Sequence, residues 1–299
     1  EMLRSLVGSE MCIRDRYYGD KKIKIKDVPT SSKPYDVEKE RIIDETEKMK
    51  PQIEDLQEKL YAEAKEGLII IIQAIDAAGK DSTIKHVMSG VNPQGVSVTA
   101  FKQPSSEELA HGFLWRAEKA VPRRGYIGIM NRSYYEDVLV VKVHNLQKTY
   151  KMPKRCVDMP AADFFKNRYK HIRNYEEYLS DNGYRVIKIF LNVSAEKQKE
   201  RFLERIDNPA KNWKFSADDL SERALWDEYQ KAFEDMINET ATKTSEWYVL
   251  PADQKWFTRY LVSKIILKTL KKMNPKYPEV SKEDKEELEE CRNELLAQK

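Results

Sequence analysis

The sequence predicts an α/β protein in which a parallel sheet is covered by helices on both faces. Segments rich in β-branched residues alternate along the chain with segments of helical periodicity. The run from Leu68 to Ile72 is continuously aliphatic, which is typical of a strand buried on both faces. The 299 residues provide one large domain or two small ones, at roughly 100–200 residues per domain.

The first part of the chain is expected to contain a long helix followed by a buried strand. Residues 36–65 are rich in Glu, Lys, Leu and Ile, which favours a helix, and Pro51 predicts a break or kink within it. Gly67 ends this helix, and the aliphatic strand comes directly after it. The next elements are expected to be a helix at residues 80–89 and a strand at residues 96–101.

Helix-capping residues mark several of the later elements. The run Ser105-Ser106-Glu107-Glu108 has the pattern of a capping box and predicts a helix that continues to about Ala120. Ser194 is the expected N-cap of a helix that reaches about Ile206. The amphipathic pattern of residues 255–273 predicts the last helix of the core, and the charged tail from Pro275 is expected to pack loosely. The remaining predictions are strands at 126–130, 184–192 and 247–250 and helices at 163–179 and 221–241.

Composition excludes several classes of protein. With 53 Lys+Arg against 50 Asp+Glu, the net charge of +3 does not indicate a nucleic-acid partner. A hydrophobic fraction of 40% is too high for a disordered chain, and no apolar run approaches the roughly 20 residues of a membrane-spanning helix. The 3 cysteines, Cys12, Cys156 and Cys291, are odd in number and far apart, so they indicate neither a disulfide framework nor a zinc site. A cytoplasmic location is expected.

The first residues fit poorly with the rest of the chain. The string from Met2 to Arg16 resembles a translated sequencing adapter, so we expect residues 1–16 to be a non-native leader and the native start to lie near Tyr17. The alternative is an ordinary N-terminal arm.

The turn after the first strand has features of a phosphate-binding loop. Residues 74–83 are AIDAAGKDST, whereas the usual pattern is G-x-x-x-x-G-K-[ST], so the match fails at Ala74 and at Asp81. The small residues still let the backbone come close to a ligand, and the following helix would point its N–H groups at an anion. The backbone and side chains expected to contact substrate here are those of Ala77, Ala78, Gly79, Asp81 and Ser82.

Charged residues in this turn suggest how a phosphate would be held. Lys80 supplies a mobile positive charge. Asp76 and Asp81 would repel a phosphate, unless a magnesium ion bridges the carboxylates and the phosphate oxygens. The alternative is a plain strand-to-helix turn with a solvated lysine.

A second group of polar residues follows the strand at 126–130. In open parallel sheets, ligands bind at the carboxyl ends of the strands. Arg132 is therefore expected to hold a transferring phosphoryl group with its planar guanidinium, although an arginine in such a place can also form a surface ion pair.

Two further segments are basic. Residues 138–175 contain nine Lys and Arg residues against Asp158 and Asp163, which indicates either a track for a long polyanion or a solvated face. Arg201 and Arg205 share one face of a helix, and the turn after it carries basic residues as well. This second segment is typical of a mobile lid over phosphates, and the alternative is a charged helix and turn with Trp213 in the core. The basic residues of the first segment are Lys142, Lys148, Lys151, Lys154, Arg155, Lys166, Arg168, Lys170 and Arg173, and those of the lid turn are Lys211 and Lys214.

Three separated stretches of the chain resemble the polyphosphate kinase 2 family. They are LIIIIQAIDAAGKDSTIKHVMSGVNPQGVSVTAF at 68–101, YIGIMNRSYYEDVLVVKVH at 126–144 and RFLERIDNPAKNWKFSADDLSERALW at 201–226. The runs HVMSGVNPQG and NRSYYE are most similar to the class III branch of that family, which is associated with phosphorylation of both nucleoside mono- and diphosphates. The resemblance implies a three-layer α/β/α phosphate-loop kinase fold with a parallel central sheet and a helical lid. The chain is expected to consist of an N-terminal extension and helix at 17–66, a kinase core at 67–273 that includes the lid at about 201–241, and a charged tail at 274–299.

The resemblance also implies roles for single residues. Asp76 matches the loop aspartate that binds magnesium and orients the accepting phosphate, and Lys80 matches the loop lysine. Asn131 stands where many members have aspartate, which shifts the metal role to Asp76, and Glu136 falls at a position that bears on the choice of acceptor. Asn208-Pro209 replaces the usual Asp-Pro of the lid. The expected catalytic residues are Asp76, Lys80, Arg132 and Arg205, and the expected substrate-binding residues include Asn131, Glu136, Arg201, Lys211 and Lys214.

The implied function is reversible transfer of the terminal phosphoryl group of inorganic polyphosphate to AMP and ADP, with Mg²⁺ as cofactor and ATP among the nucleotides bound. A homodimer or homotetramer is expected, without nucleic-acid or membrane partners. Two alternatives remain, namely an ATP-dependent nucleoside monophosphate kinase of the same fold and a non-catalytic module that binds polyanions or RNA. The phosphoryl donor separates the first alternative, and salt-dependent binding without turnover would support the second.

Overall fold

The computed structural model describes residues 16–298, which are built around one six-stranded sheet. The strands lie in the order β1-β6-β5-β2-β4-β3. All neighbouring strands are parallel except β1, which pairs antiparallel with β6 at one edge. The predicted parallel central sheet is therefore confirmed, and the short antiparallel edge strand was not expected.

The elements have the following bounds. The strands are β1 (Arg16–Tyr17), β2 (Gly67–Gln73), β3 (Val96–Ala100), β4 (Ile127–Asn131), β5 (Tyr184–Asn192) and β6 (Trp247–Pro251). The long helices are α2 (Lys39–Glu63), α8 (Ala161–Asp181), α9 (Ala195–Asp207), α11 (Trp226–Thr240), α12 (Lys255–Met273) and α13 (Lys282–Ala297). The shorter helices are α3 (Lys80–Val87), α4 (Ser106–Ala110), α5 (Trp115–Glu118), α6 (Val140–Val143), α7 (Lys154–Val157) and α10 (Asp218–Ala224), and the 3₁₀ turns include η4 (Tyr134–Val138) and η6 (Asn212–Lys214).

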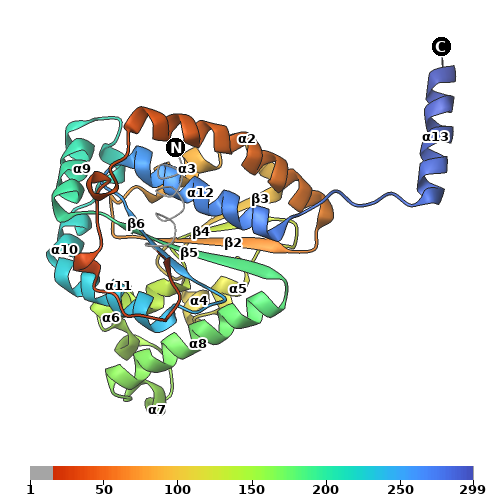
Figure 1. Ribbon diagram of the computed structural model, residues 1–299. Helices are drawn as coiled ribbons and strands as arrows, with labels where there is room; N and C mark the ends of the chain where they lie inside the picture. Colours follow the sequence, from red (N-terminus) through yellow and green to blue (C-terminus); the bar gives the residue numbers. More distant parts are fainter. Residues whose placement is uncertain (1–15, 299) are drawn as a thin grey trace.

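Helices cover both faces of the sheet and make the molecule three-layered. Figure 1 shows α2, α3 and α12 on one face and α8 and α11 on the other, with α9 and α10 at one end. The charged C-terminal helix α13 lies away from this body at the end of an extended segment, and none of its residues is buried. None of the helices within residues 16–298 combines the length and apolarity that crossing a bilayer requires.

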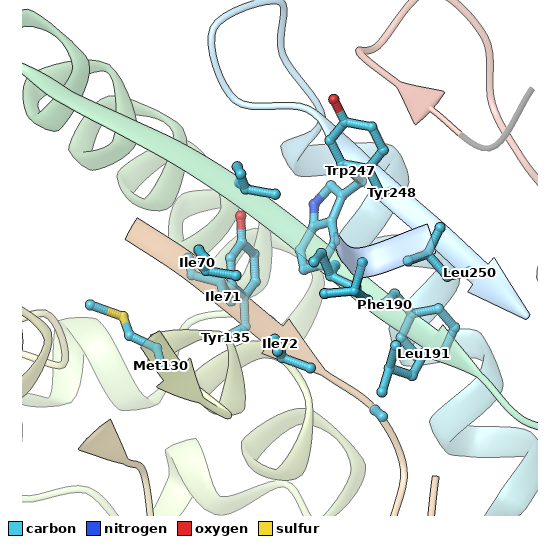
Figure 2. Close-up of a cluster of buried hydrophobic side chains, with 14 of the residues drawn as sticks. Ile70, Ile71, Ile72, Met130, Tyr135, Phe190, Leu191, Trp247, Tyr248 and Leu250 are labelled. Atoms are coloured by element: carbon cyan, nitrogen blue, oxygen red, sulfur yellow. The ribbon is translucent and has the colours of Figure 1, made fainter. Parts of the chain in front are cut away.

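The core is centred on β2, where all seven residues are buried. The aliphatic side chains of β2 pack with those of β5 and β6 on either side of the sheet, and Figure 2 shows part of this cluster. Burial on both faces is the reason that this strand is continuously aliphatic and not alternating.

The strand register brings the candidate site together. Ile72 of β2 lies beside Asn131, the last residue of β4, and Gln73 lies beside Phe190 of β5. The residues that follow β2 and β4 are therefore adjacent at the carboxyl edge of the sheet, where ligands bind in open parallel sheets.

Two predicted helices are interrupted. The capping box at Ser105 and Glu108 is confirmed, but the helix it opens ends at Ala110, and α5 begins after Gly112. The predicted helix at 221–241 is divided at Leu225 into α10 and α11. Conversely, the break expected at Pro51 is absent: α2 continues through this proline, which lies on its exposed side.

The segment between β1 and α2, residues 18–38, is called here the N-terminal strap. Ile23 and Asn238 of α11 exchange two hydrogen bonds of 2.8 and 3.0 Å, and the Thr30 hydroxyl donates to Asp253 at 2.9 Å. Residues 1–15 of the expected leader lie outside the described residues. Arg16 belongs to β1 and forms an ion pair of 3.4 Å with Glu246.

Candidate active site

Residues 74–79 form the turn from β2 into α3, and its backbone explains both departures from the usual phosphate-loop pattern. Gly79 is the N-cap of α3 with a φ of 104°, a conformation that strains other residues. Ala74 has no positive φ, so an alanine is accepted where the pattern has glycine. Asp81, which replaces the usual Ser or Thr, accepts a hydrogen bond of 2.7 Å from the side chain of Asn131 and so joins α3 to β4.

Lys80 lies inside this turn. The residue is 8% exposed, and its ammonium donates to the carbonyl oxygens of Ala74 at 3.0 Å and Ile75 at 3.3 Å. The same nitrogen is 3.9 Å from the Asp76 carboxylate. Burial lowers the pKa of Lys80, and the nearby Asp76 works against that shift.

Arg132 joins the two motifs. Its guanidinium donates to Asp76 at 2.5 Å and to Glu136 at 3.3 Å. Its φ of 59° is left-handed, a conformation that costs free energy for a residue other than glycine and that persists only where the surroundings enforce it. These contacts bring the residues that follow β2 and β4 together at one edge of the sheet.

The carboxylates of this cluster have opposite pKa shifts. Burial works to raise the pKa of Asp76, but the charges of Lys80 and Arg132 outweigh it and lower that pKa. Burial raises the pKa of Glu136, with Arg132 and Lys80 offsetting only part of the effect. Glu136 itself raises the pKa of the Arg132 guanidinium, which stays charged.

The predicted basic lid follows β5 as α9, η6 and α10, and its residues differ in exposure. Arg205 donates to the Lys214 carbonyl at 3.2 Å, and Lys211 pairs with Glu204 of α9. Trp213 is 78% exposed, so the alternative that placed it in the core is wrong. The Lys214 ammonium lies over the Trp213 ring, 4.8 Å from the ring centroid, in a cation–π contact.

Arg201, also of α9, is buried and supports the phosphate loop. One guanidinium nitrogen donates to the carbonyls of Ala77 at 2.9 Å and Ala78 at 2.8 Å. The other donates to the carbonyls of Ala252 at 2.7 Å and Asp253 at 3.0 Å, just beyond β6. Arg201 therefore fixes the carbonyls of Ala77 and Ala78, and the Ala78 N–H donates within the loop to the carbonyl of Ile75 at 3.4 Å.

Gln198 and Arg223 belong to the site although no sequence motif indicates them. The Gln198 amide, 1% exposed, donates to the backbone carbonyl of Asp76 at 3.0 Å. Arg223 of α10 donates to the Gln198 side-chain oxygen at 2.5 Å. The lid helix is thereby connected to the phosphate loop, and the only sequence signal is that Gln198 precedes Arg201 by three residues on one helix face.

A cavity of about 190 Å³ opens beside Asp76, Arg132 and Glu136. Its polar far wall is Glu222 of α10, which accepts a hydrogen bond of 2.5 Å from Tyr229 and lies 3.1 Å from the ring nitrogen of His144. The other residues that line it are Ala74, Ile75, Leu139, Val140, Tyr229 and Phe233. The lining therefore combines apolar side chains with four charged ones, Asp76, Arg132, Glu136 and Glu222.

The nine basic residues of 138–175 do not form one surface. Lys142 pairs with Asp235 at 2.8 Å, Arg168 pairs with Asp137 at 2.8 Å, and Arg173 donates to the carbonyl of Glu239. The exposed members are Lys148, Lys151, Lys154, Arg155, Lys166 and Lys170.

The site suits a divalent cation shared with substrate. Within residues 16–298 no three His, Cys, Asp or Glu side chains gather into a metal cage. Mg²⁺ is commonly held by one or two carboxylates together with substrate phosphates, and the ionised Asp76 beside the phosphate loop provides such a carboxylate.

Comparisons with known proteins agree with this geometry. A family model described as polyphosphate kinase 2 (PPK2) matches residues 36–278. An ADP-polyphosphate phosphotransferase of Rhodopseudomonas palustris is 44% identical over 269 residues, covering 90% of this chain and 92% of that protein. An AMP/ADP-polyphosphate phosphotransferase of Meiothermus ruber is 46% identical over 228 residues, covering 76% of this chain and 80% of that protein.

A solved structure gives the same result for the fold. The crystal structure of polyphosphate kinase 2 from Arthrobacter aurescens TC1 matches with a TM-score of 0.80 at 36% identity, over 89% of this chain and 90% of that one. The family and the phosphate-loop kinase fold expected from the three motifs are confirmed, and the chain belongs to the polyphosphate kinase 2 family.

Proposed function

We propose that this enzyme transfers the terminal phosphoryl group of inorganic polyphosphate to AMP and ADP, reversibly. The observation that carries the proposal is the convergence of Asp76, Lys80 and Arg132 beside a cavity at the carboxyl edge of the sheet. The names of the relatives from R. palustris and M. ruber support polyphosphate as donor and AMP and ADP as acceptors.

Phosphoryl transfer requires alignment and charge neutralisation more than covalent chemistry by the protein. The N–H groups at the start of α3 and the Lys80 ammonium would bind phosphate oxygens. Arg132, now paired with Asp76 and Glu136, would contact the transferring group with its planar guanidinium. If a substrate phosphate replaces Asp76 as one partner of Arg132, one anion is exchanged for another. The guanidinium therefore keeps a negatively charged partner throughout.

The metal we propose is Mg²⁺. Asp76 is the residue that would hold it, and when bound it would supply positive charge that stabilises the phosphate oxygens during transfer. The low pKa of Asp76 keeps this carboxylate ionised at neutral pH.

The two substrates would approach from different sides. The acceptor nucleotide suits the cavity between Glu136 and Glu222, because this cavity adjoins Asp76 and Arg132 and its lining offers apolar surface as well as charged groups. The polyphosphate suits the lid residues Arg205 and Lys211, which are partly exposed, and Lys214, which is exposed, with the exposed lysines of 148–170 as an extension. Lys142 contributes less than expected from charge alone, because Asp235 neutralises it.

The test is an assay with purified protein, Mg²⁺, polyphosphate and either AMP or ADP, with the nucleotide products separated by chromatography. The proposal expects ADP and ATP to form only when polyphosphate is present. Turnover with ATP as the sole donor would favour the ATP-dependent kinase instead, and salt-dependent polyphosphate binding without turnover would favour the non-catalytic module. We also propose that the enzyme is a cytoplasmic homodimer or homotetramer. Light scattering on the purified protein measures the mass of the oligomer and so tests this part of the proposal.

A further inference from the structure

A buried ion pair lies behind the second motif. Lys188 of β5 is 0% exposed, Glu176 of α8 is 1% exposed, and their charged atoms are 2.7 Å apart. The ammonium also donates to the Thr240 carbonyl at 2.7 Å and to the Tyr135 hydroxyl at 3.1 Å, so all three of its N–H groups are used.

The same carboxylate binds two consecutive tyrosines. The hydroxyls of Tyr134 and Tyr135 donate to one oxygen of Glu176 at 2.9 and 2.6 Å. Both rings are buried, and that of Tyr135 stands in the core with its centroid 5.0 Å from that of Trp247 (Figure 2). Residues 134 and 135 directly follow Arg132 and Ser133, so this carboxylate anchors the loop that carries the arginine.

Stability alone does not account for this pair. Moving two charges out of water costs free energy that their attraction in the interior often only offsets, and apolar residues of the same size frequently replace such pairs without loss. Arg132, in contrast, has a left-handed backbone that needs enforcement from its surroundings. One constraint on the Arg132 backbone is the hydrogen bond of 3.0 Å from its N–H to the Ile72 carbonyl of β2. The second constraint is on the residues that follow Arg132, because the hydroxyls of Tyr134 and Tyr135 are bound by Glu176.

We propose that Glu176 and Lys188 are positioning residues for phosphoryl transfer. They fix Tyr134 and Tyr135, and through these tyrosines they hold Arg132 in the conformation that reaches Asp76. The inference rests on the proposed function, because it assigns the pair to the placement of Arg132 in that reaction.

The test removes only the two hydroxyls. In the double variant Tyr134→Phe/Tyr135→Phe the rings remain and Lys188 keeps its 2.7 Å contact with Glu176. The ammonium loses the Tyr135 hydroxyl, one of its three acceptors, and the loop loses its anchor. We expect kcat for ADP phosphorylation to fall by about tenfold or more at 25 °C, with KM changed less than about threefold, since a misplaced arginine affects the transition state most. Tyr175→Phe is the matched control, because its hydroxyl lies on α8 but donates to Glu118. This control should keep the kcat of the parent.

Two further readouts separate positioning from a structural role. In an Arg132→Lys background the same tyrosine change should cost less than about threefold in kcat, because both changes act through one group. Glu176→Gln keeps an acceptor for the tyrosines but leaves Lys188 without its anion. It should therefore lower Tm more than the tyrosine double variant and kcat less.

Three results would overturn the inference: a kcat of the tyrosine double variant within twofold of the parent, a full tenfold loss in the Arg132→Lys background, or kcat losses that simply follow the losses in Tm. If the double variant does not fold, Tyr134→Phe and Tyr135→Phe alone give the same comparison. A parent enzyme without polyphosphate-dependent turnover would refute the proposed function itself, which is a different outcome from an active parent with unaffected variants.

Discussion

Replacing Arg201 with lysine removes the guanidinium that joins the phosphate loop to the end of β6. Its two terminal nitrogens bind two carbonyls each, at distances of 2.7 to 3.0 Å. A lysine has a single nitrogen and cannot reach both pairs of carbonyls. We expect the ammonium to keep one pair and to leave the other pair of buried carbonyls without a donor.

The expected cost follows from these contacts. A hydrogen bond from a charged donor contributes roughly 1.5–3 kcal/mol net, so losing two of them destabilises the protein by about 3 kcal/mol. For a chain of this size that is a fall in Tm of roughly 6 °C. Because the loop N–H groups shift with their carbonyls, kcat should also fall by about tenfold at a temperature where the variant is folded.

Scanning calorimetry and the polyphosphate-dependent assay measure the two effects on one preparation. Arg205→Lys is the matched control, because Arg205 lies one turn along α9 with a single carbonyl contact of 3.2 Å and is partly exposed. It should change Tm by less than about 2 °C. If Arg201→Lys unfolds within 1 °C of the parent and only raises KM for polyphosphate, then Arg201 faces the substrate and the reasoning from its buried contacts is wrong.

Four other variants test the site. Lys80→Met should lower kcat by about 10²–10³, as for loss of one transition-state charge contact, and turnover within a few-fold of the parent would exclude Lys80 from that role. Asp76→Asn should abolish most activity at ordinary magnesium and regain part of it at excess magnesium, so full activity at ordinary magnesium contradicts a metal role. Burial raises the pKa of Glu136, so its contribution to stability is present at low pH and is lost as pH rises through the folded-state pKa. Glu136→Gln should therefore have a higher Tm than the parent at pH 8 and lose this advantage below about pH 4. A difference in Tm between variant and parent that stays constant across pH would contradict the raised pKa of Glu136. Lys211→Ala with Lys214→Ala should reduce the slope of log affinity for polyphosphate against log salt by about 1.5 without altering nucleotide binding, and an unchanged slope would remove the lid from the donor site.

Element boundaries were predictable where local residues and the core agree. Strand Tyr184–Asn192 and helix Lys255–Met273 have the expected limits, because an Asn-Gly turn precedes the first and an amphipathic pattern defines the second. The interruption near Gly112 has a local signal that the prediction passed over, because glycine disfavours a helix interior. The break at Leu225 has no such signal, since leucine favours helix. The antiparallel strand β1 has two residues, which is too short for any periodicity to reveal.

The charged centre of the site was more predictable than its supports. Asp76, Lys80 and Arg132 stand next to strand ends, and parallel topology then requires them to meet. Gln198 and Glu176 act through partners that are distant in sequence, and neither residue has a distinctive neighbourhood. Arg201 shows the same limit, because a pattern of basic residues indicates that a helix face is charged and does not indicate which of its members is buried.

The N-terminal strap has a consequence for how the chain folds during synthesis. Asn238 follows Ile23 by 215 residues, and Asp253 follows Thr30 by 223. The strap therefore leaves the ribosome long before these partners exist. Its Val28 carbonyl can pair with Asn192 once β5 has been made, but the contacts with Asn238 and Asp253 wait for α11 and for the residues after β6. Its apolar residues Ile23, Ile25 and Val28, buried in the finished protein, are then exposed through most of translation. Because the strap also contacts Asp253, whose carbonyl is bound by Arg201, the phosphate loop gains its full support only after the first and last parts of the sheet have met.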